Sequence, residues 1–178
     1  ERYDRIEAEL RVVSDIARQR RPTVFVEGES DRLVVERAWT LFAGIPLESV
    51  NICAGDGAYG GAAALGSRAL AWMLTLRHRA PADRVRAAAL FDVDASGSAE
   101  RKALGEEMTR LGLGGLGLRL VALRIPPRLR PLSIAGFNVP VDLEALYTDD
   151  MWDRAEKRGW LEDRGNLSQL LSQRMIES

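Results

Sequence analysis

The chain has 178 residues, of which 46% are hydrophobic and 29% are charged, and its formal net charge at pH 7 is -1. This length is enough for one domain with a sizeable hydrophobic core. The near-zero net charge excludes a globally basic surface, so any surface that binds nucleic acid must be local. No apolar stretch reaches 18 residues, and we expect no membrane span.

The single cysteine and the first residue bear on the compartment and on the completeness of the chain. Cys53 cannot form an internal disulfide, which fits a reducing cytoplasm. It lies in the apolar run SVNICAG, and we expect a buried core thiol. The chain begins with Glu1 rather than Met, and we expect it to be a piece of a longer protein.

Helical and strand patterns alternate through residue 125. Helices are predicted at residues 1–20, 30–43, 62–79 and 98–112, and strands at TVFVEG, SVNICAG, RAAALFDVD and LRLVALRI. Ser30 is a candidate N-cap of the second helix and Gly44 a candidate stop. The alternation predicts an α/β Rossmannoid fold, with a mainly parallel sheet of about four strands, helices on both faces and right-handed crossovers.

The remainder of the chain has a different character. PPRLRPLSIAGFNVP predicts a proline-interrupted loop, and residues 142–158 and 166–176 predict helices. We therefore divide the chain into a leading helix at 1–21, an α/β core at 22–125 and a loop with a helical extension at 126–178. No clear boundary of a second domain is evident.

Acidic residues follow two of the predicted strands. Glu27 ends the first strand, Asp92 and Asp94 end the third, and Asp31 lies one turn into the helix after Glu27. In parallel α/β sheets, sites form at the carboxyl ends of the strands. The two-residue spacing directs Asp92 and Asp94 to one face if the strand continues through them. We expect the four carboxylates to converge on one crevice.

Two interpretations of these carboxylates stay open. Clustered carboxylates raise one another's pKa values, and Mg²⁺ or Mn²⁺, which prefer oxygen ligands, would remove the repulsion. Acids after strands are also typical of helix N-caps. The two motifs, in order and at equivalent strand ends, favour a metal site. We expect the lone His78 to be solvated or to cap a helix rather than to bind metal.

The segments VFVEGESD and LFDVDASGS, with the glycine-rich AGDGAYGG between them, resemble the Toprim domain. That family has a glutamate after a first strand and an Asp-x-Asp after a later one. The resemblance covers about residues 22–125, and VEGESDRLVVERAW is most similar to the overcoming-lysogenisation-defect (OLD) nucleases. It implies a metal-dependent DNA endonuclease, with an N-terminal ABC-type ATPase domain in the full-length protein and a homodimer formed through that domain.

The resemblance also implies roles for individual residues. Two Mg²⁺ or Mn²⁺ ions would activate water and stabilise the leaving oxygen of a phosphodiester. Glu27 has the alternative role of general base. The role of a late family lysine stays open, because the context of Lys157 departs from the pattern and the equivalent lysine could lie beyond the chain. The implied metal ligands are Glu27, Asp31, Asp92, Asp94 and, in VDLEALY, Glu144.

Two loops near the acids are candidates for contacts with phosphate. The backbone N–H groups of Gly55 and Gly57 in GDGAYGG could approach phosphate, or these glycines could serve only a tight turn. No Gly-Lys-Ser/Thr follows, which excludes a Walker A loop. Ser96 either contacts phosphate or a metal-bound water, or is a turn serine before Gly97.

Arginines after the fourth strand are the candidate DNA contacts. Arg124, Arg128 and Arg130 lie in RIPPRLRP, whose first residues should leave the sheet at the edge that carries the acids. Contacts of this kind would bind phosphate without reading base sequence. The alternative is a solvated connecting loop.

Three other functions remain. LFDVDASGS also resembles the Asp-x-Asp motif of haloacid-dehalogenase-like phosphatases, but that family carries it on the first strand, and VEGESD would be unexplained. A primase or topoisomerase activity is the second alternative, although Tyr3, Tyr59 and Tyr147 lack the context of a topoisomerase nucleophile. The third is a non-catalytic Toprim-like assembly module, which would gain little from clustered carboxylates.

Overall fold

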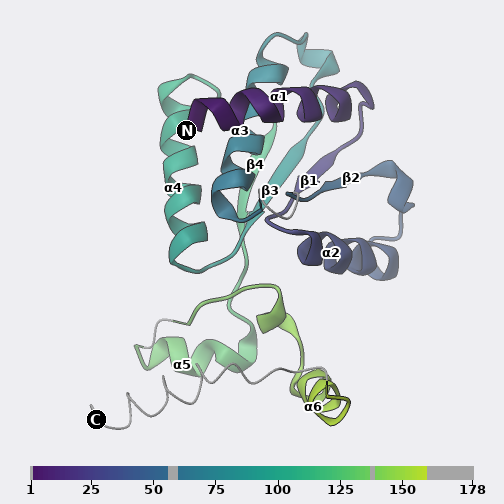
Figure 1. The fold of residues 1–178 in the computed structure, drawn as a ribbon, viewed down its shortest axis with the longest axis vertical. Coiled ribbons are helices and arrows are strands. Elements are labelled where there is room, and N and C mark those ends of the chain that lie inside the picture. Colours follow the sequence, from purple (N-terminus) through teal and green to yellow (C-terminus); the bar gives the residue numbers. More distant parts are fainter. Residues whose placement is uncertain (1, 56–59, 137–138, 160–178) are drawn as a thin grey trace. The chain divides into compact units, whose positions relative to one another are not determined.

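The computed structural model describes residues 2–55, 60–136 and 139–159. Four parallel strands form one sheet in the order β2-β1-β3-β4 (Figure 1). The central strands are β1 (Thr23–Phe25) and β3 (Ala87–Phe91), and the edge strands are β2 (Asn51–Cys53) and β4 (Leu118–Ala122). The predicted parallel α/β sheet of about four strands is confirmed.

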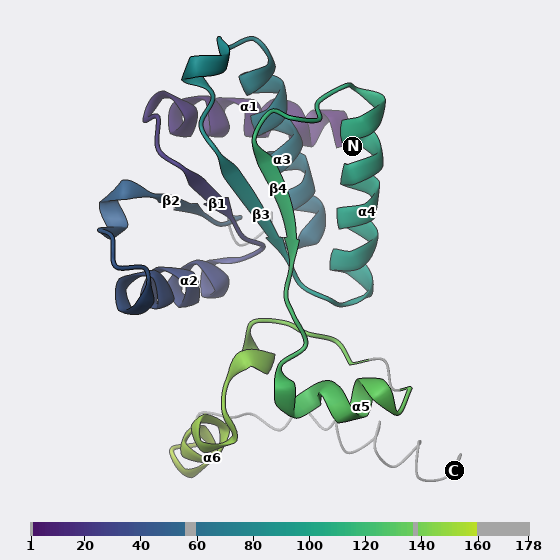
Figure 2. The ribbon, with the colours of Figure 1, turned by 180° about the vertical axis from the view of Figure 1, so that it is seen from behind.

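Helices connect successive strands on both faces of the sheet. The connections are α2 (Glu29–Phe42), α3 (Ala62–Arg77) and α4 (Ala95–Arg110), and α1 (Arg2–Arg18) precedes β1. The β1-to-β2 and β2-to-β3 connections run in opposite directions across the sheet, so right-handed crossovers place α2 and α3 on opposite faces. The α3 helix lies in front of the sheet in Figure 1 and behind it in Figure 2, and α1 packs against α3.

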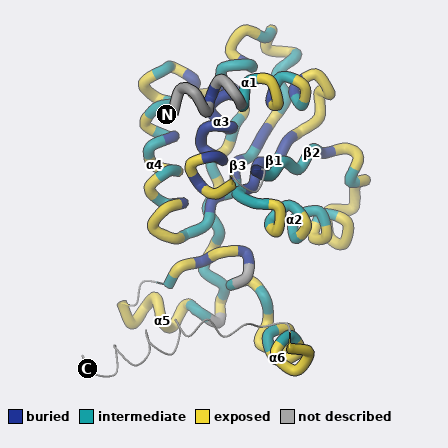
Figure 3. The backbone as a smooth tube through the Cα atoms, in the orientation of Figure 1, coloured by how far each residue is buried: buried dark blue, intermediate teal, exposed yellow. Residues whose placement is uncertain are grey.

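The hydrophobic core lies between the sheet and helices α1, α3 and α4 (Figure 3). The α3 helix is buried along most of its length, and the ring of Trp72 meets that of Phe25 edge-on, with 5.5 Å between the centroids. Val13 and Ala17 of α1 are fully buried. By contrast, α2 has no buried residue. The core therefore fixes β1 and β3, the two strands that precede the acids.

Several element ends differ from the sequence predictions. The N-cap of α2 is Gly28, so the assignment of Ser30 is wrong. Gly44 follows the helix with φ +67°, which confirms the predicted stop. The third strand ends at Phe91 rather than continuing to Asp94, because Asp94 is the N-cap of α4.

Short helical turns follow β4 in the region predicted as a loop. These are the 3₁₀ turn Pro127–Leu129 and the helix α5 (Arg130–Ile134), and the turn Glu144–Leu146 and the helix α6 (Asp149–Lys157) come later. The chain divides into two compact units, residues 1–145 and 146–178. In the second, the rings of Tyr147 and Trp152 lie 5.9 Å apart. The helix predicted at 166–176 lies outside the described residues.

Within the described ranges, the helices are too short or too polar to cross a lipid bilayer.

Candidate functional site

Glu27 joins the ends of the two central strands. It lies just beyond β1, and its Oε1 accepts a hydrogen bond from the backbone N–H of Asp92, 3.2 Å away, just beyond β3. The carbonyl oxygen of Glu27 accepts a second bond from the N–H of Gly61, at the start of α3. Glu27 is half-buried. The glutamate of the first motif and the Asp-x-Asp of the second therefore meet at the carboxyl edge of the sheet.

Asp31 and Asp94 both cap helices. Asp31, in the first turn of α2, accepts at Oδ2 a bond of 2.8 Å from the N–H of Gly28, the N-cap of that helix. Asp94 Oδ1 accepts one of 2.6 Å from the N–H of Gly97 at the start of α4. The capping interpretation is thus confirmed for both residues. It does not exclude a metal site, because each bond uses one oxygen of a group that has two.

Gly97 allows α4 to begin directly against the end of β3. A Cβ atom at this position would lie 2.4 Å from the carbonyl oxygen of Asp92, a distance that no side chain tolerates. Gly97 thereby keeps Asp92 and the capping Asp94 close together. Its place in DVDASG was visible in the sequence, but the close approach depends on the angle between strand and helix.

Asp142 is an acidic residue that sequence reasoning missed. Val93 and Val141 form an isolated antiparallel bridge, with N–H···O distances of 2.7 Å and 3.1 Å. In that register Asp142 lies across from Asp92 on the same side of the paired segments. Asp142 Oδ1 also accepts a bond from the N–H of Ala145. The family pattern points to Glu144 instead, which begins a 3₁₀ turn two residues later.

The acids act on one another electrostatically. The pKa of Asp92 is raised to about 7, first by burial and then by the charges of Glu27, Asp31, Asp142 and Asp94, in that order of importance. Burial also raises the pKa of Glu27, against the bond from the Asp92 N–H, and Asp94 and Asp31 add to the rise. The structure thus brings together the four predicted carboxylates and Asp142, which we call the acidic cluster.

The acidic cluster contains the oxygen donors that a metal site needs, but they are not arranged to coordinate one ion. Within residues 2–55, 60–136 and 139–159, no three His, Cys, Asp or Glu side chains form a group that could hold a metal ion. Glu27, Asp31 and Asp94 are each turned toward a backbone N–H group. An all-oxygen donor set fits Mg²⁺ or Mn²⁺ in chemistry. Side-chain rotation would have to complete the geometry.

Gly55 and Ser96, two other predicted contact residues, lie near this edge. Gly55 is buried two residues after β2, and Gly57 lies outside the described residues. Ser96 is exposed in the first turn of α4.

The arginine-containing segment leaves the sheet where the sequence predicted. The N–H of Leu123 donates to the carbonyl of Phe91, so Arg124 emerges, exposed, at the carboxyl edge. Arg128 lies in the 3₁₀ turn that follows, and Arg130 is exposed at the start of α5. The role of these arginines as DNA contacts stays a prediction.

Comparison of the chain with family models, curated proteins and solved structures finds no match. A functional conclusion therefore depends on the residues and their geometry.

Proposed function

We propose that this chain is the Toprim-type catalytic domain of a metal-dependent DNA endonuclease of the OLD kind. One observation carries the proposal: Glu27 and Asp92, each placed by a motif at the end of a strand, are joined by a hydrogen bond across the two central strands. A parallel α/β sheet places its ligand sites at this edge. The raised pKa of Asp92 supports the proposal, because perturbed carboxyls gather at functional sites.

The residues of the acidic cluster would hold the metal and position a phosphodiester. Two divalent ions, when bound, would supply an activated water and charge stabilisation for the leaving oxygen. Asp92 and Asp94 would hold one edge of the site, and Glu27 would bind metal or accept a proton. Asp142, and Glu144 two residues on, would approach from the segment bridged to Val93.

The wider expectations belong to the same proposal. DNA is the substrate, an ABC-type ATPase domain precedes this chain in the full-length protein, and that domain forms a homodimer. The proposal also places the protein in the cytoplasm, where Cys53 stays reduced. Cys53 is partly rather than fully buried and packs against the core, and burial raises the pKa of its thiol to about 11, which suits an unreactive residue.

Plasmid cleavage tests the proposal. The purified chain should nick or cut supercoiled plasmid in Mn²⁺ or Mg²⁺ and lose the activity in EDTA. Asp92→Asn should lower the cleavage rate at least about a hundredfold, since it removes a charge from a site built to hold divalent ions. Asp153→Asn, at an exposed position in α6, is the matched control and should cut like wild type.

Two results would contradict the proposal. Asp92→Asn could cut at the wild-type rate, which would exclude its role. Alternatively, the folded wild-type chain could release phosphate from a small phosphomonoester with either metal and leave DNA intact, which would favour the phosphatase alternative.

A further inference from the structure

Two arginine-rich segments meet at the amino edge of the sheet, opposite the acidic cluster. One precedes β1 and the other precedes β3, and these strands are parallel neighbours. The N–H of Thr23 donates to the carbonyl of Arg86, which brings the segments together. We call their seven arginines the arginine edge: Arg18, Arg20, Arg21, Arg77, Arg79, Arg84 and Arg86.

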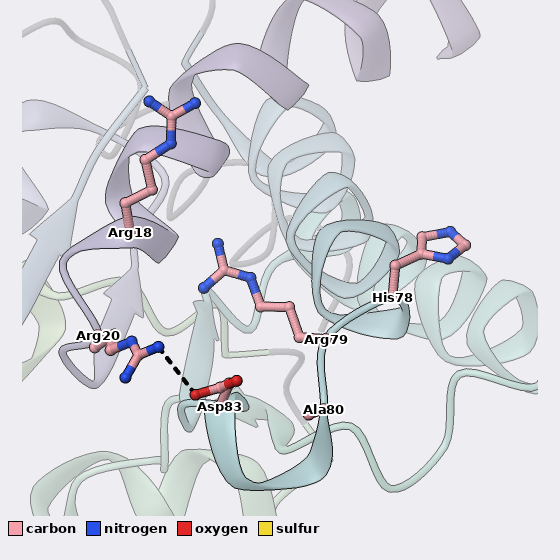
Figure 4. A pocket seen from close by; sticks show the side chains of 6 residues that line it. All are labelled: Arg18, Arg20, His78, Arg79, Ala80 and Asp83. Carbon is pink, nitrogen blue, oxygen red and sulfur yellow. Dashed lines mark ion pairs between the residues drawn. The ribbon is translucent and has the colours of Figure 1, made fainter.

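A pocket of about 470 Å³ lies within the arginine edge (Figure 4). Its charged lining consists of three arginines and one carboxylate, that of Asp83. In Figure 4 the side chain of Arg79 extends toward Arg18 and Arg20, whereas the ring of His78 points away from them. His78 is the exposed C-cap of α3, as the sequence predicted. Arg79 is anchored, since its Nη1 donates to the carbonyl of Ala17, 2.9 Å away.

Helix capping accounts for some of these arginines. The α1 and α3 helices both end here, and basic residues at helix C-termini offset the negative end of the helix dipole. Arg79 satisfies a carbonyl in the last turn of α1. Arg18 forms an ion pair of 3.3 Å with Asp15, and both side chains are about three-quarters exposed.

The side chain of Arg20 is not explained in this way. Its φ of +54° lies in the left-handed region, just after α1, where glycine is the favoured residue. Its ion pair with Asp83 is 3.0 Å long, but the Arg20 side chain is 69% exposed, and exposed pairs contribute little to stability. The left-handed φ thus belongs to the end of α1, whereas the exposed guanidinium beside the pocket contributes little to folding.

We infer that the arginine edge binds the phosphate backbone of DNA, with one phosphate held in the pocket by Arg18, Arg20 and Arg79. The planar guanidinium fork matches phosphate oxygens. The arginine edge extends beyond the pocket and holds more arginines than one phosphate needs, which fits an extended polyanion. The acidic cluster repels DNA in the absence of metal, so attraction must come from another surface. The choice of DNA rests on the proposed function.

DNA binding without metal tests this inference separately from cleavage. A fluorescent duplex would be titrated in EDTA over a series of salt concentrations. Arg18→Ala/Arg20→Gly should weaken binding roughly tenfold at low salt and reduce the salt slope by about 2. The melting temperature should not fall, because glycine relieves the strain at position 20. Arg37→Ala/Arg101→Ala removes the same charge at exposed helix positions and should bind like wild type.

Three outcomes would overturn the inference. The Arg18/Arg20 variant could keep the wild-type affinity and salt slope. Arg128→Ala/Arg130→Ala could abolish the salt dependence while the Arg18/Arg20 variant does not, which would assign the contact to the loop after β4. Inorganic pyrophosphate could bind to wild type while DNA does not, which would leave a site for small anions only.

Discussion

Asp92 is the residue on which the acidic cluster acts most strongly. Its carboxyl is half-buried at the end of a core strand, and four other carboxylates raise its pKa. No hydrogen bond to the carboxylate of Asp92 is present among the described residues, although its backbone N–H donates to Glu27. The fold therefore holds the Asp92 carboxyl where its negative charge is unfavourable. A bound divalent cation or a proton would neutralise that charge.

The raised pKa of Asp92 should make the free energy of unfolding of the metal-free protein depend on pH. The pKa of Asp92 in the folded protein is about 7, above the ordinary 3.8. Between these values the native state binds more protons than the unfolded chain, so the free energy of unfolding falls as pH rises from about 4 to 7. Asp92→Asn cannot ionise and should lack this fall. Above pH 7 it should be more stable than wild type by on the order of 1–2 kcal/mol, discounted for solvent screening.

Urea unfolding in EDTA at several pH values measures this difference. Asp153→Asn, which also removes one carboxylate, should follow the wild-type profile. If the free energy of unfolding depended on pH in the same way in wild type and in Asp92→Asn, the charge of Asp92 would not destabilise the folded protein.

At the level of elements, a buried ion pair holds α1 on α3. Arg68 donates from Nε and Nη2 to the two carboxylate oxygens of Glu9, both at 2.7 Å. The two side chains are only 6% and 12% exposed. Such a pair contributes little over an apolar replacement, but the loss of one partner leaves a buried charge. The loss of either partner should therefore weaken the packing of α1 on α3.

Single and double substitutions should separate these effects. Glu9→Ala should lower the free energy of unfolding by about 3–5 kcal/mol, because Arg68 would remain charged and buried. Glu9→Leu/Arg68→Met should recover most of that loss. Asp15→Ala, which breaks the exposed pair with Arg18, is the control and should change stability by less than about 1 kcal/mol. Chemical denaturation of the three variants would test this, and a double variant as unstable as Glu9→Ala would contradict it.

The spacing of hydrophobic residues predicted the helices and strands, because that spacing reflects which side chains are buried. The ends of these elements depend on specific contacts, which the spacing does not reveal. Ile6, Val13 and Ala17 are buried as expected of an amphipathic helix. The third strand was predicted too long, since a capping Asp94 ends it and no local pattern separates a strand acid from a cap. Asp142 was missed for a different reason: its approach to Asp92 depends on a bridge between segments far apart in the sequence.

Across the first unit of the chain, the near-zero net charge conceals a separation of charge. Acids gather at the carboxyl ends of β1 and β3, and arginines gather where the same strands begin. Both sets are fixed by the same two strands, so the alternation that predicted the sheet also predicted the acidic edge. The arginine edge was not recognised in the sequence, because β1, α2, β2 and nearly all of α3 lie between its two segments and only the strand order brings them together.

Because the acids and the arginines lie at opposite edges of the sheet, a bound metal should stabilise the protein through the acidic cluster and not through the arginine edge. A ligand at a hundredfold its Kd adds about 2.7 kcal/mol to the free energy of unfolding, or roughly 5–10 °C in Tm for a chain of this size. Mn²⁺ should therefore raise the Tm of wild type, and EDTA should reverse the rise. The effect should weaken as pH falls below about 7, because protons compete with the metal at Asp92.

Asp92→Asn should lose most of the Tm shift, while Arg18→Ala/Arg20→Gly should retain it in full. An equal Mn²⁺ shift in wild type and Asp92→Asn would mean that the metal binds elsewhere on the chain.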